Sequence, residues 1–208
     1  MRVLLTAGPT REPLDPVRFL SNRSSGRMGY ALARALLAEG HQVVLVTGPT
    51  ALRPPAKAKV VPVETAEDML AACRRHWSDC DAVVGVAAVA DYRPARHSGD
   101  KLKRTEGQGL SLELVPNPDI LATLAKDKGG RLAVGFALES GDGKVEALRK
   151  LRAKNLDFVV LNGPEAQGAE QASLRVFDAI GKERHLGPAR KPTLAKQLVR
   201  WIFGRIPA

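Results

Sequence analysis

The sequence predicts an α/β protein built on a Rossmann-like, doubly wound and mostly parallel sheet with helices on both faces. Short apolar runs, typical of strands buried on both faces, alternate along the chain with amphipathic helical segments. A serine- and glycine-rich segment joins the first strand to the first helix, where such folds bind phosphates. We therefore expect one domain over residues 1–208, with a ligand crevice outside the carboxyl ends of the strands.

The first strand is the apolar run 2–6, and the first helix follows residues 21–29, which read Ser-Asn-Arg-Ser-Ser-Gly-Arg-Met-Gly. Apolar residues recur at helical spacing after this segment, Ser24 or Ser25 can serve as the N-cap, and Gly40 stands where a C-terminal glycine belongs. The N–H groups at such a helix start are unpaired and attract anions, and the glycines let a polyphosphate approach closely. The segment is therefore interpreted as an anion-binding loop, although capping serines are also common without any ligand.

The connection over residues 7–23 is longer than the ~2–6 residues usual in α/β units. It holds prolines and charges without periodicity, and long ordered loops are usually functional. Polar and basic side chains crowd around the serines: Arg11, Arg18, Asn22, Arg23 and Arg27. This clustering favours a ligand site over a simple helix cap.

The second strand is the apolar run 42–47, and the third is the short run 59–63. A helix is then expected from Thr65, its N-cap, to about Trp77, because Asp68 stands three residues on and completes a variant of the capping box.

The fourth strand, 82–86, is followed by the small residues 87–90 and then by Asp91, at the expected rim of the crevice. Small side chains leave room for a flat base, although an aspartate here could equally cap a plain turn. The polar stretch 93–104 is expected to form a flap, in which Lys101 would neutralise charge on a leaving pyrophosphate. A solvated basic turn is the alternative.

Residues 110–114 alternate strictly between apolar and polar, which predicts a half-exposed strand. A helix is expected over 118–126, with Asn117 as its N-cap, proline at its first position and an acid in its first turn. The buried strand 132–136 ends in Phe136, which could wall a base or fill the core.

A helix over 143–154 is expected to place Lys150 and Lys154 on one face and an apolar stripe on the other. The stripe consists of Val145, Leu148 and Leu151. The remaining elements are a parallel strand at 158–161, a further strand at 174–177 and a closing helix at 193–203.

The formal net charge of +10 makes nucleic acid the first partner to consider, although a surface that attracts small polyanions, or one that only solubilises the protein, explains the charge as well. Nucleic acid is unfavoured, because aromatics are only 4% of the residues and no helix-turn-helix, RNP or zinc-finger pattern occurs. The cysteines and histidines have no metal or redox spacing, so no metal ligand from protein side chains is expected. No segment reads as a signal peptide or approaches the ~20 apolar residues of a membrane helix, which predicts a cytoplasmic protein without a membrane.

Residues 6–29, from Thr-Ala-Gly-Pro-Thr-Arg to Ser-Ser-Gly-Arg-Met-Gly, closely resemble the opening of bacterial phosphopantothenoylcysteine synthetases, the ligase half of the bifunctional coenzyme A flavoprotein. Segments that look like later motifs of this family, in order and at similar spacing, are 87–94, 101–104, 117–120, 135–137 and 154–157. The resemblance covers most of the chain up to about Asn162. The chain departs from the family at Arg104, where lysine is usual, and over 162–172, where an acidic, glycine-rich stretch with an aromatic is usual.

The resemblance implies a phosphopantothenate–cysteine ligase of coenzyme A biosynthesis. CTP, with Mg²⁺ as cofactor, would activate phosphopantothenate as an acyl-cytidylate and release pyrophosphate, and L-cysteine would then displace CMP to give phosphopantothenoylcysteine. It also implies a preference for CTP over ATP and a homodimer in which the partner completes the crevice. A separate phosphopantothenoylcysteine decarboxylase is a possible further partner.

By the same resemblance Asn22 and Lys101 are catalytic, with Asn22 holding the reacting carbonyl of the substrate or intermediate. The substrate-binding residues are Arg18, which would take the substrate phosphate, Asn22 and Ala88. The nucleotide-binding residues are Ser24, Ser25, Gly26, Gly85, Val86, Ala87, Asp91, Lys101, Pro118, Asp119, Ile120, Leu121, Phe136, Lys150 and Lys154.

Two other classes of function compete with this interpretation. A dinucleotide-dependent reductase would use the same strand–helix opening, but the Gly-x-Gly-x-x-Gly pattern is missing and Thr47-Gly48 stands where an acidic residue should end the second strand. A basic nucleic-acid-binding protein would use the net charge of +10.

Overall fold

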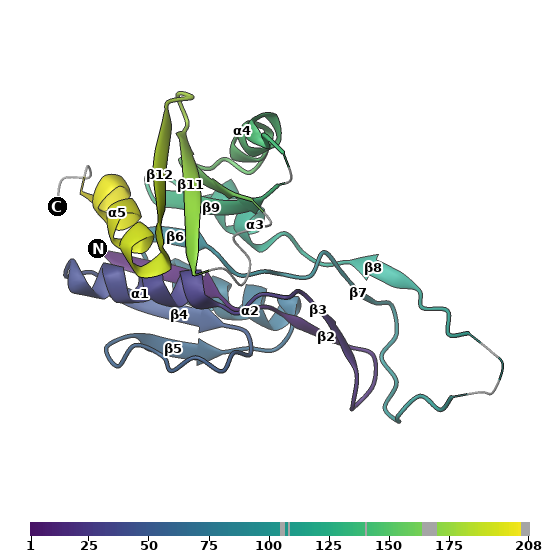
Figure 1. The fold of residues 1–208 in the computed structure, drawn as a ribbon. Coiled ribbons are helices and arrows are strands. Elements are labelled where there is room, and N and C mark those ends of the chain that lie inside the picture. The colour runs from purple at the N-terminus through teal and green to yellow at the C-terminus, as the bar shows by residue number, and fades with distance from the viewer. Residues whose placement is uncertain (105–106, 108, 140, 164–169, 205–208) are drawn as a thin grey trace.

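An eight-stranded sheet organises the computed structural model, which describes residues 1–104, 107, 109–139, 141–163 and 170–204 (Figure 1). The strand order is β12-β11-β10-β9-β6-β1-β4-β5, in which the strands from β10 to β5 are parallel and β11 pairs antiparallel with both of its neighbours, β10 and β12. The strands are β1 (Arg2–Ala7), β4 (Gln42–Thr47), β5 (Lys59–Pro62), β6 (Ala82–Gly85), β9 (Leu132–Leu138), β10 (Phe158–Asn162), β11 (Gln171–Asp178) and β12 (Glu183–Arg190). The chain order reverses between β1 and β6, so the predicted doubly wound fold is confirmed.

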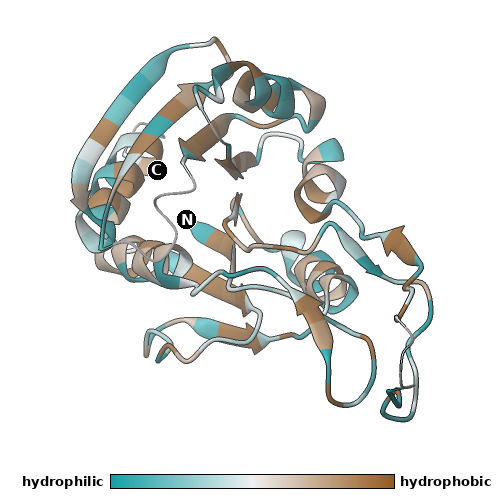
Figure 2. Cartoon of the chain, turned by 45° about the vertical axis from the view of Figure 1, so that its right-hand side comes forward, coloured by the Kyte–Doolittle hydropathy of each residue, from teal (hydrophilic) through white to brown (hydrophobic). Residues whose placement is uncertain are grey.

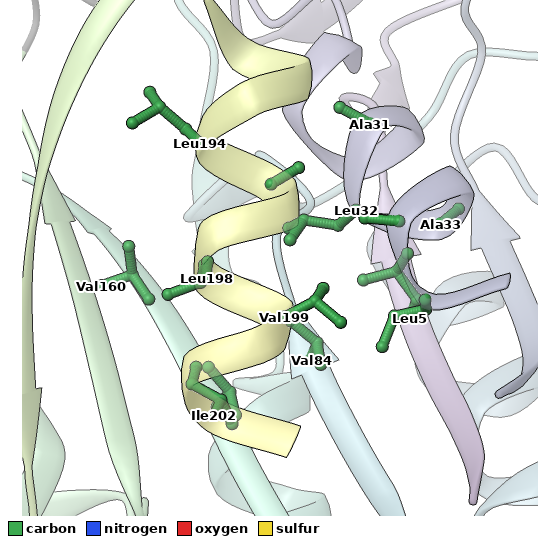
Figure 3. Close-up of a cluster of buried hydrophobic side chains, with 14 of the residues drawn as sticks. Leu5, Ala31, Leu32, Ala33, Val84, Val160, Leu194, Leu198, Val199 and Ile202 are labelled. Carbon is green, nitrogen blue, oxygen red and sulfur yellow. The ribbon is translucent and has the colours of Figure 1, made fainter. Parts of the chain in front are cut away.

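Helices cover both faces of the sheet, and each face has its own hydrophobic core. On one face lie α1 (Arg27–Ala38) and α5 (Lys191–Phe203), and on the other lie α2 (Ala66–Trp77), α3 (Ile120–Lys126) and α4 (Lys144–Ala153). Neighbouring strand residues alternate between the two cores: Leu5 faces α1 and α5, whereas Leu4 faces the other side. Figure 3 shows Leu198 of α5 directed toward the sheet beside α1, and Figure 2 shows that the central strands are largely hydrophobic.

The local sequence pattern predicted the N-terminal cap of α2 but not that of α1. The Thr65 side chain accepts the Asp68 N–H and the Asp68 side chain accepts the Thr65 N–H, so the predicted capping box of α2 is confirmed. The predicted serine cap of α1 is wrong: the N-cap is Gly26, whose φ of 72° favours glycine, and no side chain caps the helix. Ser24 instead accepts the N–H of Gly26 itself, one residue before the helix begins.

The predicted cap of α3 is also displaced. Asp119, not Asn117, is the N-cap, and its carboxylate accepts the N–H of Ala122 at 2.9 Å. The helix therefore begins at Ile120 and Pro118 lies before it. Asn117 is engaged elsewhere, because its side-chain nitrogen donates to the carbonyl of Ala90 at 2.8 Å.

Two antiparallel ribbons were not predicted. The long connection 7–23 folds back on itself as the hairpin β2 (Arg11–Pro13) and β3 (Phe19–Ser21). The strands β7 (Tyr92–Pro94) and β8 (Leu114–Pro116) pair to form an arm that projects from the body (Figures 1 and 2). The strand expected over 110–114 is thus reduced to its last residue, because its partner β7 pairs only with 114–116.

One further prediction was wrong in detail, and one strand was not predicted. Val145 was expected to face inward but is 83% exposed, because α4 buries the pair Ala147 and Leu151, one turn apart, and Leu148 packs only partly against them. Strand β12 had no expected counterpart, since its sequence, Glu-Arg-His-Leu-Gly-Pro-Ala-Arg, lacks apolar alternation and buries only Leu186.

Acid should weaken the β11–β12 end of the sheet through Glu183. Arg175 donates to this carboxylate at 2.7 Å and Lys144 at 2.8 Å, and these bonds lower the pKa of Glu183 to about 2. Because its pKa is lower in the folded protein than in the unfolded chain, Glu183 contributes its full stabilisation of the fold above the unfolded pKa of about 4.3. This contribution is lost as the pH falls toward the folded pKa of about 2. We expect Glu183→Gln to lower the urea midpoint at pH 7, with a difference from wild type that shrinks to nothing near pH 2. A difference independent of pH would contradict this.

Candidate functional site

A cavity of about 610 Å³ opens at the carboxyl ends of β1, β6 and β9, where the strand order reverses. Its walls are the start of α1, the segment 85–91 that follows β6, the start of α3 and one side of α4. This is the position expected for a ligand site in a doubly wound sheet.

The cavity brings together residues from five parts of the chain that the sequence places far apart. Of the predicted site residues it is lined by Asn22, Ser24, Ser25, Gly26, Gly85, Val86, Ala87, Ala88, Asp91, Pro118, Asp119, Ile120, Leu121, Phe136, Lys150 and Lys154. Two predicted residues, Arg18 and Lys101, are not part of this lining.

Buried threonines hold the segment 86–90 in place. The hydroxyl of Thr6 accepts the N–H groups of Val86 at 3.2 Å and Ala87 at 3.3 Å, and the hydroxyl of Thr10 accepts the N–H of Ala90 at 3.0 Å. Both threonines are at most 4% exposed. Sequence reasoning missed them, although their position on either side of the Gly-Pro turn that ends β1 could have suggested a role.

Two asparagine side chains donate hydrogen bonds to backbone carbonyls of the same segment. The side-chain nitrogen of Asn22 donates to the carbonyls of Ala88 at 3.2 Å and Val89 at 3.0 Å, while Asn117 donates to Ala90. The backbone adds a bond from the N–H of Ala88 to the carbonyl of Gly8 at 2.9 Å. The segment is therefore rigid before any ligand arrives, which lowers the entropic cost of ligand binding.

Close packing at the start of α1 requires small residues. A Cβ atom on Gly29 would lie 2.6 Å from the Cβ of Ala7, so glycine lets the helix approach the end of β1. The left-handed Gly26 precedes it, and Ser24 and Ser25 flank the helix start. The first residues of α1, whose N–H groups have no partner within the helix, line the cavity, which is the placement that an anion-binding loop needs.

The cations of the cavity are of two kinds. Lys150 pairs with Glu139, and Lys154 pairs with Asp119 at 2.8 Å, so an incoming anion must compete with these carboxylates. Arg23, Arg27 and Lys191 also line the cavity, and no ion pair joins them to a carboxylate within the described part of the chain. This second group carries positive charge that is available to a ligand.

Neither Arg18 nor Lys101 lines the cavity, and Arg18 contacts the residue that follows Lys101. Arg18 donates from Nε and Nη2 to the buried carboxylate of Asp15, at 2.9 and 2.6 Å, and also to the carbonyl of Leu102 at 2.7 Å. Asp15 in turn accepts the N–H of Leu102 at 3.1 Å, and the Arg18 guanidinium holds the pKa of Asp15 well below its usual range. Asp15 and Arg18 therefore anchor the flap to the β2–β3 hairpin at Leu102, the residue that follows Lys101.

The remaining structural expectations concern ions, membranes and the divergent loop. No group of three or more His, Cys, Asp or Glu side chains that could hold a metal occurs among the described residues. No helix in the same part of the chain is long and apolar enough to cross a bilayer. Within the loop 162–172, residues 164–169 lie outside the described residues.

Comparison with known proteins gives consistent matches. The family model for the DNA/pantothenate metabolism flavoprotein C-terminal domain matches residues 1–205. The coenzyme A biosynthesis bifunctional protein CoaBC of Bacillus subtilis is 45% identical over 205 residues, which are 96% of this chain and 50% of that protein. The CoaBC of Escherichia coli K12 is 45% identical over 212 residues, 99% of this chain and 52% of that protein. The chain thus spans about half the length of these curated relatives.

Solved structures agree with this match. The crystal structure of the C-terminal domain of CoaBC superposes with a TM-score of 0.84 at 39% identity and covers 97% of this chain and 93% of that one. A mutant of Cab2 in complex with phosphopantothenate-cysteine has a TM-score of 0.83 at 18% identity, covers 98% of this chain and 85% of that one, and supports the fold alone.

Proposed function

The chain belongs to the DNA/pantothenate metabolism flavoprotein C-terminal domain family, and on that premise we propose that it is a phosphopantothenate–cysteine ligase of coenzyme A biosynthesis. The observation that carries the proposal is the cavity itself. A rigid backbone segment, a helix start with free N–H groups and unpaired cations converge on it, whereas no Cys or His is among its described lining residues. Such a site suits two displacements at bound substrates without a covalent enzyme intermediate.

The reaction proceeds in two steps that need positioning and charge stabilisation. In the first, the carboxylate of phosphopantothenate attacks the α-phosphorus of CTP, and pyrophosphate leaves. In the second, the amine of L-cysteine attacks the acyl carbon, CMP leaves, and the amine loses a proton. The first turn of α1 with Arg23 and Arg27 binds the phosphates, and Asn22 lies beside the reacting carbonyl.

The cofactor proposed with CTP is Mg²⁺, which would neutralise part of the triphosphate charge. Mg²⁺ is usually held by substrate phosphates, water and one or two carboxylates. Among the described lining residues Asp91 fits this role, since no lysine or arginine pairs with its carboxylate, whereas Asp119 is paired with Lys154.

The assay that tests the proposed function follows the products. The protein is supplied with phosphopantothenate, L-cysteine, Mg²⁺ and CTP, and pyrophosphate and phosphopantothenoylcysteine are measured. A parallel binding screen with CTP, NADH and duplex DNA separates this function from a reductase and from a nucleic-acid-binding protein. Binding of NADH or DNA without product formation would contradict the proposal.

We expect kcat/KM for CTP to exceed that for ATP. The residues at the cavity wall from the end of β6 onward, Gly85 to Ala88, are small, so a base can reach their backbone groups, which we expect to match the edge of cytosine. Thr6 already accepts the N–H groups of Val86 and Ala87, so these cannot donate to the base, and carbonyl oxygens remain to accept from an exocyclic amine. UTP, which lacks that amine, is the matched control and should be a poor substrate. Equal or ATP-favouring values would contradict this prediction.

The proposed enzyme is a cytoplasmic homodimer in which the partner completes the crevice. Apolar side chains are exposed along the arm, at Tyr92 (56%), Leu110 (61%) and Leu114 (43%), and on the hairpin at Val17 and Phe19. Lys101, on the flap, does not line the cavity of its own chain, so a second copy would give it a site in which to act. The curated relatives are named bifunctional, so in them a second activity is fused to the matched region, and a separate decarboxylase stays a proposal for this chain.

A further inference from the structure

A second cavity, of about 630 Å³, lies between α1 and the start of α5, next to the proposed nucleotide site. Its floor is apolar: Ala31 and Ala35 lie one turn apart on α1, and Leu52 closes the floor from the connection after β4. Figure 1 shows α1 and α5 side by side at this place.

The rim of this cavity is strongly basic. Its cations are Arg27, Arg34, Arg190, Lys191 and Lys196, and Glu170 is the only acid among the described lining residues. No ion pair joins any of the five to a carboxylate in the described ranges, and Arg34 is held only by backbone carbonyls, such as that of Arg53 at 2.9 Å. Burial, and to a smaller extent the nearby charge of Arg27, lower the pKa of Lys191.

We propose that this cavity is a second ligand site, which takes an organic phosphate with a short apolar chain or ring. A phosphate monoester carries close to two negative charges and can accept from several of the surrounding guanidinium and ammonium groups at once. The alanine and leucine floor gives the apolar part a surface to cover. Inorganic phosphate alone would contact only the basic rim, and an alcohol would contact only the apolar floor.

The site is coupled to the nucleotide cavity through shared residues. Arg27 and Lys191 line both cavities, so an anion in one lowers the positive charge available to the other. Occupancy of the second cavity therefore weakens nucleotide binding, and by linkage the nucleotide weakens the second ligand by the same factor. This coupling rests on the proposed function, whereas binding at the second cavity does not.

The test is calorimetric titration of the whole chain with hexyl phosphate at low salt, with inorganic phosphate and hexanol as single-property probes. We expect saturable one-to-one binding of hexyl phosphate, tighter than either control and weakened by salt. Lys196→Gln should raise its Kd about tenfold, because one charged contact is lost, and Glu170→Gln should lower it. Lys126→Gln, an exposed lysine on α3 that lines neither cavity, is the matched control and should change nothing.

Two results would overturn the assignment. One is that hexyl phosphate does not bind at all, or that it binds with a Kd that Lys196→Gln and Glu170→Gln leave unchanged. An unchanged Kd would mean that the probe binds in the nucleotide cavity instead. The other is binding to vesicles that contain phosphatidic acid without binding of soluble hexyl phosphate, which would make the basic rim a membrane contact. A CTP affinity that falls with hexyl phosphate in wild type, but not in Lys196→Gln, supports the coupling.

Discussion

Replacing Asn22 with alanine is expected to lower the rate of ligated product formation by about 10²–10³-fold while the Kd for CTP stays nearly unchanged. The phosphates dock on the first turn of α1, whose N–H groups do not depend on the Asn22 side chain. The amide instead stabilises the charge that builds on the acyl carbonyl as the cysteine amine attacks, and such donors act mainly in the transition state. Acyl-nucleotide should therefore accumulate in the variant.

The structure adds a second task for Asn22 and a control for it. Its amide nitrogen holds the carbonyls of Ala88 and Val89, and Asn117 holds the same segment at Ala90. If Asn22 acts only by fixing this segment, Asn117→Ala should have the same kinetic signature. If Asn22 acts on the substrate carbonyl, Asn117→Ala should mainly weaken CTP binding. Loss of CTP binding in Asn22→Ala, with normal turnover once CTP is bound, would show that its catalytic assignment is wrong.

Asn22→Asp should be at least as harmful as the alanine variant. The amide nitrogen of Asn22 now donates to the carbonyls of Ala88 at 3.2 Å and Val89 at 3.0 Å, and a carboxylate oxygen in its place could only accept, so both hydrogen bonds would be lost. The carboxylate would also repel the phosphates of both substrates. Product formation by the aspartate variant that exceeds that of Asn22→Ala would contradict this role.

Lys101→Gln should leave folding intact and slow pyrophosphate release by about 10²–10³-fold. The Lys101 side chain is exposed on the flap. The neighbouring residue Leu102 is held through its backbone by hydrogen bonds to the side chains of Asp15 and Arg18, and the substitution leaves these bonds intact. Lys126→Gln again serves as the control for a lost surface charge. Unchanged pyrophosphate release in Lys101→Gln would make Lys101 an ordinary surface residue.

Mixing subunits tests whether Lys101 acts across the proposed dimer. Asn22→Ala and Lys101→Gln homodimers each have two defective sites, whereas a mixed dimer has one intact site if Lys101 enters the partner's cavity. Random exchange then restores about a quarter of wild-type activity, since half of the dimers are mixed and each has one intact site of two. No recovery would mean that Lys101 serves its own cavity, and a fully active monomer in light scattering would refute the dimer.

The sequence by itself determined the features that depend on neighbouring residues. The buried parallel strands, the helices between them and the capping box at Thr65 are set by local periodicity and short-range hydrogen bonds, and they were predicted to within a few residues. The segment from Asn22 to Gly26 and the small residues after β6 were placed at one site, because the carboxyl ends of neighbouring parallel strands must meet at one edge of the sheet.

Only the tertiary structure decided what depends on residues far apart along the chain. The bonds from Thr6 and Thr10 to the segment 86–90 join residues about 80 positions apart, and no local pattern encodes them. The same is true of Asn117, which was expected to cap a helix and is engaged instead by Ala90. Lys101 was expected on a polar flap and is exposed in that segment, but its absence from the cavity lining follows from how the segment is anchored to Asp15, a contact between residues far apart in the sequence.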